Sequence, residues 1–544
     1  MAEYDFIVVG AGSAGAVLAN RLSEDPKNKV LLIEAGGGDK NPIFRLPILA
    51  GGAYWYKRSN WGYVTEPQAG LKGRTLKWPR GKVLGGSSTI NGMMYMRGNR
   101  SVYDDWATKE GLTGWSYSEV LPYFLRGEDA PARAGSPFHN VGGELRVSPA
   151  PALNPLYDDF LASGREVGHP EMPDPNVAEP EGLGPFDFNI RDGRRESSST
   201  AFLWPVKTRP NLEIRTEVMV RKLMIEGSRV TGVELDGPAG PRNVTCRREI
   251  ILSSGVINTP QILMLSGIGP GEVLQKAGIE TVRDLKGVGE NLHDHIGVYL
   301  TYACKDPVSL YSLFRPDRGA MQLANAVFRR KGPMACAPLE AGGFLRTREG
   351  LSEPDIHMTF VPGLSLETSQ KGQGQHGFII HVYPTRPESR GRLWIESADP
   401  RQAPKIDPNC FGAPSDMETF YGGIRLAHEI ATTGPLSARR KEFLSYDPTM
   451  LSDESAMADW VRGSAETVFH PVGTARMGTG ADAVVDAELK VRGLEGLRIA
   501  DASVMPCVTG ANTSAPSMMI AEKAADMILG RTPLAAMDPD AVAA

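Results

Sequence analysis

The stretch "YDFIVVGAGSAGAVLANRL", Tyr4 to Leu22, constrains the fold of this chain more than any other. Its apolar run at 6–9 predicts a buried parallel strand, and residues 14–23 predict a helix. A second apolar run, "NKVLLIEAG", follows at 28–36. A strand, a turn, a helix and a strand within so short a stretch predict a βαβ unit, and therefore an α/β fold.

Three glycines, Gly10, Gly12 and Gly15, occupy the turn between this strand and helix in a GxGxxG pattern. The first allows a tight turn, the second lets a pyrophosphate approach the backbone, and the third lets helix and strand pack closely. Glu34 ends the second strand and can accept hydrogen bonds from ribose hydroxyls. The pattern predicts a dinucleotide site of the Rossmann type, although it does not distinguish NAD from FAD.

Further pieces of the same style recur later, in "REIILSSGVINTPQILMLSGIG" and in "LRIADASVMP" with the helix that follows and ends at Gly530. Between them, "HGFIIHVYPTRPESRGRLWIES" alternates as antiparallel strands do. We therefore predict a discontinuous Rossmann-like domain and a second, substrate-binding domain built on an antiparallel sheet covered by helices. The expected bounds are 1–155, 210–305 and 462–535 for the first domain, 156–209 and 306–461 for the second, and 536–544 for a flexible end of the tail "RTPLAAMDPDAVAA".

Composition excludes several classes of protein. The net charge of -5 comes without long single-sign runs, which argues against nucleic-acid binding. The 5 cysteines are scattered without a CxxC, which argues against a disulfide framework or a zinc cluster. We see no secretory signal and no apolar stretch long enough for a transmembrane helix. The expectation is a reduced cytoplasmic protein, monomeric or homodimeric, with peripheral attachment to the inner membrane left open.

"GKVLGGSSTINGMMYMRGNRSVYDDW" is dense in glycine and small hydroxyl residues, so a flat ligand could approach the backbone there. The stretch resembles the first signature of the glucose–methanol–choline (GMC) family of FAD oxidoreductases. "GVINTPQILMLSGIG" resembles the second signature, with Val256 where a smaller residue is usual. "VGENLHDH", "FHPVGTARMG" and "GANTSAPSMMIAEKAADMI" are also similar to family segments. The residues in register in the first signature are Gly81, Leu84, Gly85, Gly86, Ser87, Ser88, Ile90, Asn91, Tyr95, Gly98 and Asp104.

The resemblance implies FAD-dependent oxidation of a primary alcohol to the aldehyde, with hydride passing to flavin N5. His470 matches the histidine that the family places beside the flavin and is the expected proton acceptor, a role that suits a neutral imidazole. Asn512 matches the second catalytic position, and its amide can hold the substrate oxygen. Ile90 stands where some members tether FAD through a histidine, so noncovalent FAD is implied.

The remaining expected contacts follow from the same resemblance. Glu340, in "APLEAGGFLRT", matches a glutamate linked to cationic substrates, and Phe469 precedes the catalytic histidine where choline oxidisers often have tyrosine. No metal is expected, because His293 and His295 lack further ligands in a metal-binding pattern. The residues expected to bind FAD are Gly10, Gly12, Ser13, Ala14, Gly15, Glu34, Ala35, Arg80, Val83, Gly85, Gly86, Ser87, Asn91, Gly92, Met93, Met94, Val220, Ser254, Gly255, Asp501, Ala502 and Thr513.

Several alternatives stay open from the sequence. The electron acceptor is a quinone, another carrier or oxygen, and an oxygen-using oxidase of aryl or furan alcohols is an alternative to a dehydrogenase. Choline is one candidate substrate among primary alcohols. A non-redox protein similar to the hydroxynitrile lyases, which keep FAD without redox turnover, is a further alternative.

Overall fold

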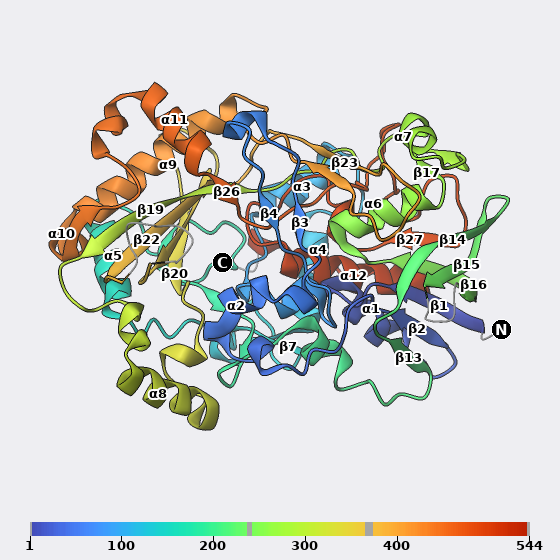
Figure 1. The fold of residues 1–544 in the computed structure, drawn as a ribbon. Helices are drawn as coiled ribbons and strands as arrows, with labels where there is room; N and C mark the ends of the chain where they lie inside the picture. Colours follow the sequence, from blue (N-terminus) through green and yellow to red (C-terminus); the bar gives the residue numbers. More distant parts are fainter. Residues whose placement is uncertain (1–2, 237–241, 365–373, 541–544) are drawn as a thin grey trace.

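The computed structural model describes residues 3–236, 242–364 and 374–540, which form two seven-stranded sheets with helices packed around them (Figure 1). The first sheet has the order β13-β2-β1-β16-β15-β14, and β27 also pairs with β16. Its strands are β1 (Glu3–Val9), β2 (Val30–Ile33), β13 (Leu212–Arg215), β14 (Met219–Glu226), β15 (Arg229–Asp236), β16 (Arg242–Leu252) and β27 (Leu497–Ile499).

The predicted βαβ unit forms the centre of this sheet. β1 pairs in parallel with β2 on one side and with β16 on the other, so that Val8 lies opposite both Leu32 and Ile251. All three side chains are buried, as expected for strands covered on both faces. Because the strand order reverses at β1, the crevice beyond its carboxyl end is where an open α/β sheet binds its ligand.

The second sheet is antiparallel and has the order β25-β19-β22-β21-β20-β9, with β26 also paired to β19. Helix α9 packs on β22, and α5 packs against α9 and α10. This arrangement confirms the predicted fold class. The strands are β9 (Gly182–Pro185), β19 (Ile296–Cys304), β20 (Ala341–Leu345), β21 (Ile356–Val361), β22 (Gly377–Pro384), β25 (Arg440–Phe443) and β26 (Glu466–Thr467).

The helices lie around both sheets, and none of those in the described residues is long and apolar enough to cross a membrane. β5 (Met94–Tyr95) forms a small sheet with β10 (Asp187–Phe188) and β8 (Ser148–Pro149), and its Met94 lines the cavity described below. The helices are α1 (Ser13–Leu22), α2 (Ala50–Trp55), α3 (Arg100–Thr108), α4 (Tyr117–Gly127), α5 (Pro155–Glu166), α6 (Gly255–Leu265), α7 (Gly271–Lys276), α8 (Pro316–Ala324), α9 (Ser415–Thr432), α10 (Gly434–Arg439), α11 (Glu454–Ser464) and α12 (Ser514–Leu529).

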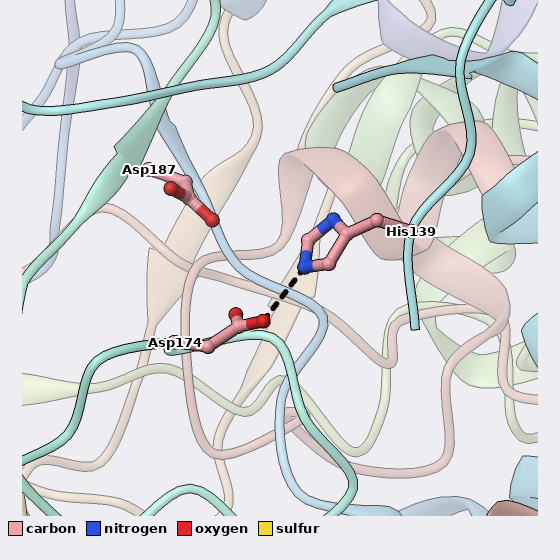
Figure 2. Close-up of side chains that lie close together, drawn as sticks. All are labelled: His139, Asp174 and Asp187. Atoms are coloured by element: carbon pink, nitrogen blue, oxygen red, sulfur yellow. Dashed lines mark hydrogen bonds and ion pairs between the residues drawn. The ribbon is translucent and has the colours of Figure 1, made fainter. Parts of the chain in front are cut away.

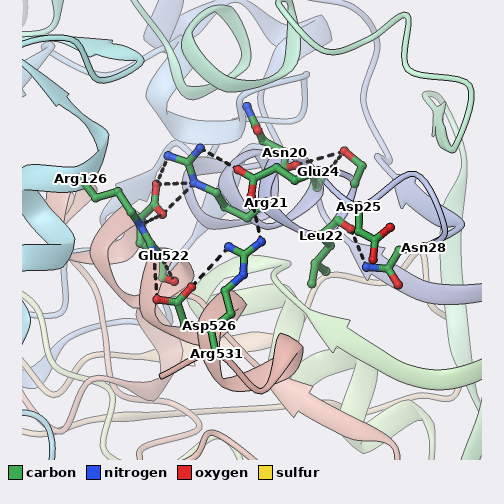
Figure 3. A network of polar contacts seen from close by, with 12 residues as sticks. Asn20, Arg21, Leu22, Glu24, Asp25, Asn28, Arg126, Glu522, Asp526 and Arg531 are labelled. Atoms are coloured by element: carbon green, nitrogen blue, oxygen red, sulfur yellow. Dashed lines mark hydrogen bonds and ion pairs between the residues drawn. The ribbon is translucent and has the colours of Figure 1, made fainter. Parts of the chain in front are cut away.

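A buried ionic network joins α1 to α4 and α12 (Figure 3). Glu522 of α12 accepts hydrogen bonds from Arg21 at 2.8 Å and from Arg126 at 2.7 Å, and Arg126 also reaches Asp526 at 2.8 Å. Removing one partner of such a buried pair typically costs about 3–5 kcal/mol. The network therefore holds the helix that follows the glycine turn against the helix that follows Asn512.

The strand pairing places one domain boundary differently from the sequence. The first domain was expected to run to residue 305, yet β19 pairs with β22, β25 and β26 in the second sheet. That boundary therefore belongs before Ile296, and we propose the division into two domains with this change. Periodicity could not reveal it, because an apolar run does not say which sheet a strand joins.

The C-terminal segment also differs from the expectation of a disordered tail. The amide of Leu534 donates to the Tyr123 hydroxyl at 3.1 Å, and that of Met537 donates to the Ser118 carbonyl at 2.9 Å. Asp540 pairs with Arg100 at 2.7 Å. Residues 531–540 thus lie along α3 and α4, while 541–544 lie outside the described residues.

Candidate active site

A long cavity opens at the carboxyl ends of the first sheet's parallel strands and runs toward the second sheet; the empty space within it, partly open to solvent, is about 1480 Å³. Its wall runs from the glycine turn at Gly12 to His470 and Asn512, and this extent suits an elongated dinucleotide. Of the residues expected at FAD, those lining the cavity are Gly10, Gly12, Ser13, Ala14, Glu34, Ala35, Arg80, Gly86, Ser87, Asn91, Gly92, Met93, Met94, Val220, Ser254, Gly255, Asp501, Ala502 and Thr513.

Three of the expected residues do not line the cavity. A Cβ on Gly15 would stand 1.8 Å from the Gly10 carbonyl oxygen, so this glycine serves the close packing of the turn. Gly85 has a φ of +84°, and a Cβ at this position would collide with the Thr89 hydroxyl. Val83 is buried in a small apolar cluster. These three residues support the residues of the cavity wall without lining the cavity themselves.

Gly12 and Gly86 face each other across the glycine turn. A Cβ on Gly86 would stand 2.7 Å from the Cα of Gly12, whereas a Cβ on Gly12 would meet only the Cα of Gly86, at 4.0 Å. Gly12 is also the N-cap of α1, whose first turn carries no acidic residue. An open glycine backbone at a helix N-terminus fits a pyrophosphate, so the residues present fit FAD.

Glu34 does more than the sequence indicated. Its carboxylate accepts hydrogen bonds from the backbone N–H of Ala11 at 3.0 Å and of Gly36 at 2.7 Å. Burial raises the pKa of Glu34 to about 7, against the lowering effect of these two N–H groups. The side chain therefore braces the glycine turn as well as lining the cavity.

Asp501 plays a similar part at the start of α6. Its carboxylate accepts hydrogen bonds from the Gly255 N–H at 2.8 Å, the Thr259 hydroxyl at 2.6 Å and the Ser503 N–H at 2.8 Å. Burial raises the pKa of Asp501. The carboxylate thus ties the segment after β27 to the segment after β16.

His470 and Asn512 meet at the cavity, as the resemblance implied. His470 follows β26 and Asn512 precedes α12, and the Asn512 Nδ2 lies 2.9 Å from the His470 Nε2. The Asp294 carboxylate accepts a hydrogen bond from the His470 N–H at 2.8 Å, and Arg80 donates to the Phe469 carbonyl at 2.9 Å. Phe469 has a φ of +67°, so these contacts hold a strained bend that presents the imidazole.

The ring nitrogens of His470 are fixed by a chain of hydrogen bonds. His295 Nε2 lies 2.8 Å from the Thr385 carbonyl oxygen and must donate to it, since a carbonyl only accepts. The other nitrogen of a neutral His295 is then an acceptor, and it lies 3.0 Å from the His470 Nδ1. His470 therefore carries its hydrogen on Nδ1, and its Nε2 lone pair accepts the Asn512 N–H at the cavity.

Burial keeps these imidazoles neutral. It lowers the pKa of His295 to about 4. The pKa of His470 lies well below its ordinary value, first because of burial and then because of the neighbouring His295, His357 and Arg80. The Asn512 Oδ1 is buried and has no hydrogen-bond partner among the described residues. A neutral base and a neutral amide thus meet at the cavity.

The two predicted substrate residues lie differently. Phe469 lines the cavity, with its ring centroid 5.3 Å from that of Tyr54. Glu340 is not in the wall: its carboxylate accepts a hydrogen bond from the Ala152 N–H at 2.6 Å, and burial raises its pKa to about 7. Its neighbour Leu339 packs against the apolar cluster that contains Met93 and Met94, which line the cavity.

Sequence reasoning missed several wall residues. Tyr54, Trp61, Asn258 and Gln261 also line the cavity. The first two come from the aromatic-rich stretch "AYWYKRSNWGY", which gave a signal of composition that was not used. Asn258 and Gln261 lie on α6 and are hydrogen-bonded to each other at 3.1 Å, a pairing visible only once the helix is placed.

His139, Asp174 and Asp187 form a cluster of the kind that can hold a metal ion (Figure 2). Two cations already balance it: Arg133 pairs with Asp187 at 2.9 Å, and His139 Nε2 lies 2.9 Å from Asp174. Burial lowers the pKa of His139, but its bonds to Asp174 and Glu128 outweigh this and raise it. We therefore interpret the cluster as an ionic network. 

The histidine pair that suggested a metal has its nitrogens engaged elsewhere. His293 Nε2 donates to the Pro387 carbonyl at 2.7 Å, and its Nδ1 accepts from the Val508 N–H at 3.1 Å. His295 is engaged on both sides by Thr385 and His470. Neither ring offers a free lone pair to a metal ion.

Three features together define a flavoprotein oxidoreductase: a nucleotide-binding sheet with parallel central strands, a second antiparallel sheet, and a histidine–amide pair at the cavity between them. Residues 4–297 match the N-terminal domain and residues 387–521 the C-terminal domain of the GMC oxidoreductases, and the chain belongs to this family. It is an FAD-dependent oxidoreductase that acts on CH–OH groups. The resemblance seen in the sequence is thus confirmed.

Characterised relatives match along the whole chain. An oxygen-dependent choline dehydrogenase of Photobacterium profundum is 41% identical, over 98% of this chain and 94% of the relative. The mitochondrial choline dehydrogenase of Mus musculus is 41% identical, over 98% and 90%. Among solved structures, pyridoxine 4-oxidase from Mesorbium loti has a TM-score of 0.88 at 33% identity, covering 97% of this chain and 100% of that one. A formate oxidase has a TM-score of 0.91 at 30% identity, covering 97% and 98%.

Proposed function

We propose that this enzyme oxidises a primary alcohol to the aldehyde, with His470 Nε2 as the acceptor of the hydroxyl proton. The observation that carries the proposal is the tautomer of His470, whose Nδ1 hydrogen is directed to His295 and whose Nε2 faces the cavity. A depressed pKa keeps this nitrogen unprotonated at neutral pH. A positioned base of this kind typically contributes about 10²–10⁴-fold to the rate.

Asn512 supports the same step. Its amide has two N–H groups, of which one donates to the His470 Nε2 at 2.9 Å and would give way to the substrate hydroxyl there. The second can hold the substrate oxygen and stabilise the negative charge that develops as the proton leaves. The amide does this without changing its own protonation. His470 thus accepts the proton and Asn512 holds the oxygen, and both side chains are neutral and come from different segments of the chain.

The residues that would hold FAD follow from the cavity wall. Gly12 and the N-terminus of α1 would take the pyrophosphate, and Glu34 would take the adenosine ribose. Gly92, Met93 and Met94 would lie at the isoalloxazine, because they line the same cavity as Asn512 and the two methionines share a buried cluster with its neighbour Ala511. FAD, when bound, supplies the N5 atom that accepts the hydride. Ile90 is buried and offers no nucleophile, which supports noncovalent binding.

The substrate is proposed only as a class. The choline dehydrogenases among the relatives make choline a candidate, and Glu340 is the buried carboxylate that would attract its charge. Tyr54, Trp61 and Phe469 give the cavity an aromatic lining suited to cationic or aryl groups. Because Glu340 lies behind the wall, neutral primary alcohols belong in the same screen.

One screen tests the proposal. Purified holoenzyme is mixed anaerobically with choline and with aliphatic and aryl primary alcohols, and flavin bleaching is followed by stopped flow. Bleaching with formation of the aldehyde supports the proposal. Cleavage of a cyanohydrin with no bleaching by any alcohol would instead support a lyase.

The electron acceptor and location are also proposals. We favour a dehydrogenase that passes electrons to a quinone or another carrier in the cytoplasm, and comparison of oxygen with an artificial dye as acceptor decides between this and an oxidase. Light scattering of the holoenzyme decides between a monomer and a homodimer.

A further inference from the structure

Exposed large apolar side chains are concentrated in two segments of the described chain. Of the ten that are exposed, Leu49 and Trp55 lie at α2, and Tyr311, Met321, Leu323 and Phe328 lie at or near α8. Phe328 is the most open of them, with 84% of its surface exposed, and Met321 follows with 56%. Apolar groups gathered on one surface in this way mark an interaction site.

The two segments are neighbours in the fold. Leu46, just before α2, shares a small buried cluster with Ala326 and Ala335, which flank Phe328 on either side in the sequence. Figure 1 shows α8 standing out from the body on the same side as α2. α8 buries none of its own residues, so its sequence is not explained by packing within this chain. We call Leu49, Trp55, Met321, Leu323 and Phe328 the α2–α8 face.

Exposed apolar and basic side chains lie close together along α8 and the turn that follows it. Met321 lies in α8, and Phe328 lies in the short π-helix Asn325–Arg329 that continues it. Arg318 precedes Met321 by three residues, and Arg329 follows Phe328 directly. Basic side chains therefore border the apolar positions.

Charge sets this segment apart from the rest of the protein. Residues 310–331 include Arg315, Arg318, Arg329, Arg330 and Lys331 against a single acid, Asp317, for a net charge of about +4, whereas the whole chain carries -5. Arg315 pairs with Asp317 at 3.1 Å. Arg318, Arg329 and Lys331 have no carboxylate of the described residues within 4.0 Å. Their charge is available to an anionic partner.

We propose that the α2–α8 face docks on the surface of an anionic lipid bilayer. Exposed apolar side chains with arginines beside them suit the membrane interface, where binding grows with apolar burial and with anionic lipid. A positive segment on a negatively charged protein also orients the molecule, because the rest of its surface is repelled. The proposal does not depend on which alcohol is the substrate.

The same face adjoins the catalytic cavity. Tyr54, in α2, lines the cavity, and Leu339, eleven residues after Phe328, packs against the cluster that contains the wall residues Met93 and Met94. Docking would therefore bring the cavity close to the bilayer. A membrane-soluble electron acceptor or a long apolar alcohol would then have a short path to the site, which fits the proposed passage of electrons to a quinone.

Vesicle sedimentation with the full-length holoenzyme tests the docking. Vesicles of phosphatidylcholine with phosphatidylglycerol should bind the protein, vesicles of phosphatidylcholine alone should bind it far less, and high salt should release it. The double variant Met321→Ser/Phe328→Ser should lower the partition coefficient by at least about tenfold. Arg318→Glu/Arg329→Glu should remove the dependence on phosphatidylglycerol.

A matched control comes from the first domain. Val282 is 50% exposed and lies far in sequence from the α2–α8 face, so Val282→Ser should leave vesicle binding unchanged. All of these variants should keep the wild-type rate with a soluble alcohol and a soluble dye, which shows that they fold. Absence of wild-type binding to either vesicle, or an equal loss in Val282→Ser, would overturn the proposal. A dimer that Phe328→Ser dissociates, without vesicle binding, would show that a second copy covers the face instead.

Discussion

The Nδ1 atoms of His470 and His295 lie 3.0 Å apart, and this contact decides which nitrogen of His470 can take a proton. Two nitrogens at this distance must share one hydrogen. His295 already donates through Nε2 to the Thr385 carbonyl, so the hydrogen belongs to His470. When His470 Nε2 is protonated, the ring keeps its Nδ1 hydrogen bond to His295 and so keeps its orientation. His295 is therefore a positioning residue for the base.

Replacement of His295 tests this relationship. His295→Phe removes the acceptor and should slow flavin reduction by at least about tenfold, as loss of a residue that orients a histidine commonly does. His295→Gln can still accept the hydrogen and should recover most of the rate. Because charge repulsion from His295 contributes to the low pKa of His470, His295→Gln should move the acid limb of the pH–rate profile to higher pH. A uniform loss with an unmoved limb would show that His295 only supports the fold.

Removal of the base itself should be the most damaging change at the site. His470→Ala should slow flavin reduction by at least about 10²-fold, the lower end for loss of a general base. Asn512→Ala should lose a similar factor if the oxyanion forms fully, and less if proton and hydride leave together. Neither residue is placed at the phosphates, so FAD content should stay normal. Near wild-type bleaching by His470→Ala in anaerobic stopped flow would refute the assignment.

The pH profile of the wild-type enzyme tests the low pKa of His470. An imidazole with an ordinary pKa would lose its lone pair as the pH falls through about 6.5. The pKa of His470 lies well below that value because of burial. The rate of flavin reduction should therefore stay level as the pH falls through 6.5 and decline only at clearly lower pH. A decline centred near 6.5 would mean that the base is less buried than the structure indicates.

The glycine turn allows a sharp test of cofactor binding, because its glycines differ in what surrounds them. A Cβ on Gly12 meets nothing closer than 4.0 Å, so Gly12→Ala should fold and yet occupy the space of the pyrophosphate. Gly12→Ala should therefore give folded protein with much less FAD, and Gly12→Val should be colourless. Gly15→Ala, whose Cβ would collide with Gly10 at 1.8 Å, should instead lower the melting temperature. Full FAD content in folded Gly12→Val would contradict the placement.

Local pattern was enough to predict the βαβ unit of the first sheet, whereas His470 was proposed as the base only from the family resemblance, and the network around it was not predicted. The turn, β1 and Glu34 are close in sequence, so periodicity and spacing revealed them. His295 was seen only as half of a metal-like pair, because its partner lies far along the chain. The same holds for β19, whose assignment to a sheet depends on pairing with β22, and for Glu34, whose bonds to Ala11 and Gly36 appear only in three dimensions.

The pH dependence of KM tests whether Glu340 selects a cationic substrate. Burial raises its pKa to about 7, so the side chain is largely neutral below this pH and negatively charged above it. Only the charged form attracts a cationic alcohol. If Glu340 helps to bind such a substrate, the KM for choline should fall as the pH rises through about 7, while the KM for a neutral alcohol should stay level.

Glu340→Gln keeps the size of the side chain but cannot ionise, so it should raise the KM for choline and remove this pH dependence. Ala152 would still meet an oxygen of the amide, which keeps the local fold. Equal losses for cationic and neutral alcohols in Glu340→Gln would show that the carboxylate serves the structure of the segment around Ala152 and does not select the substrate.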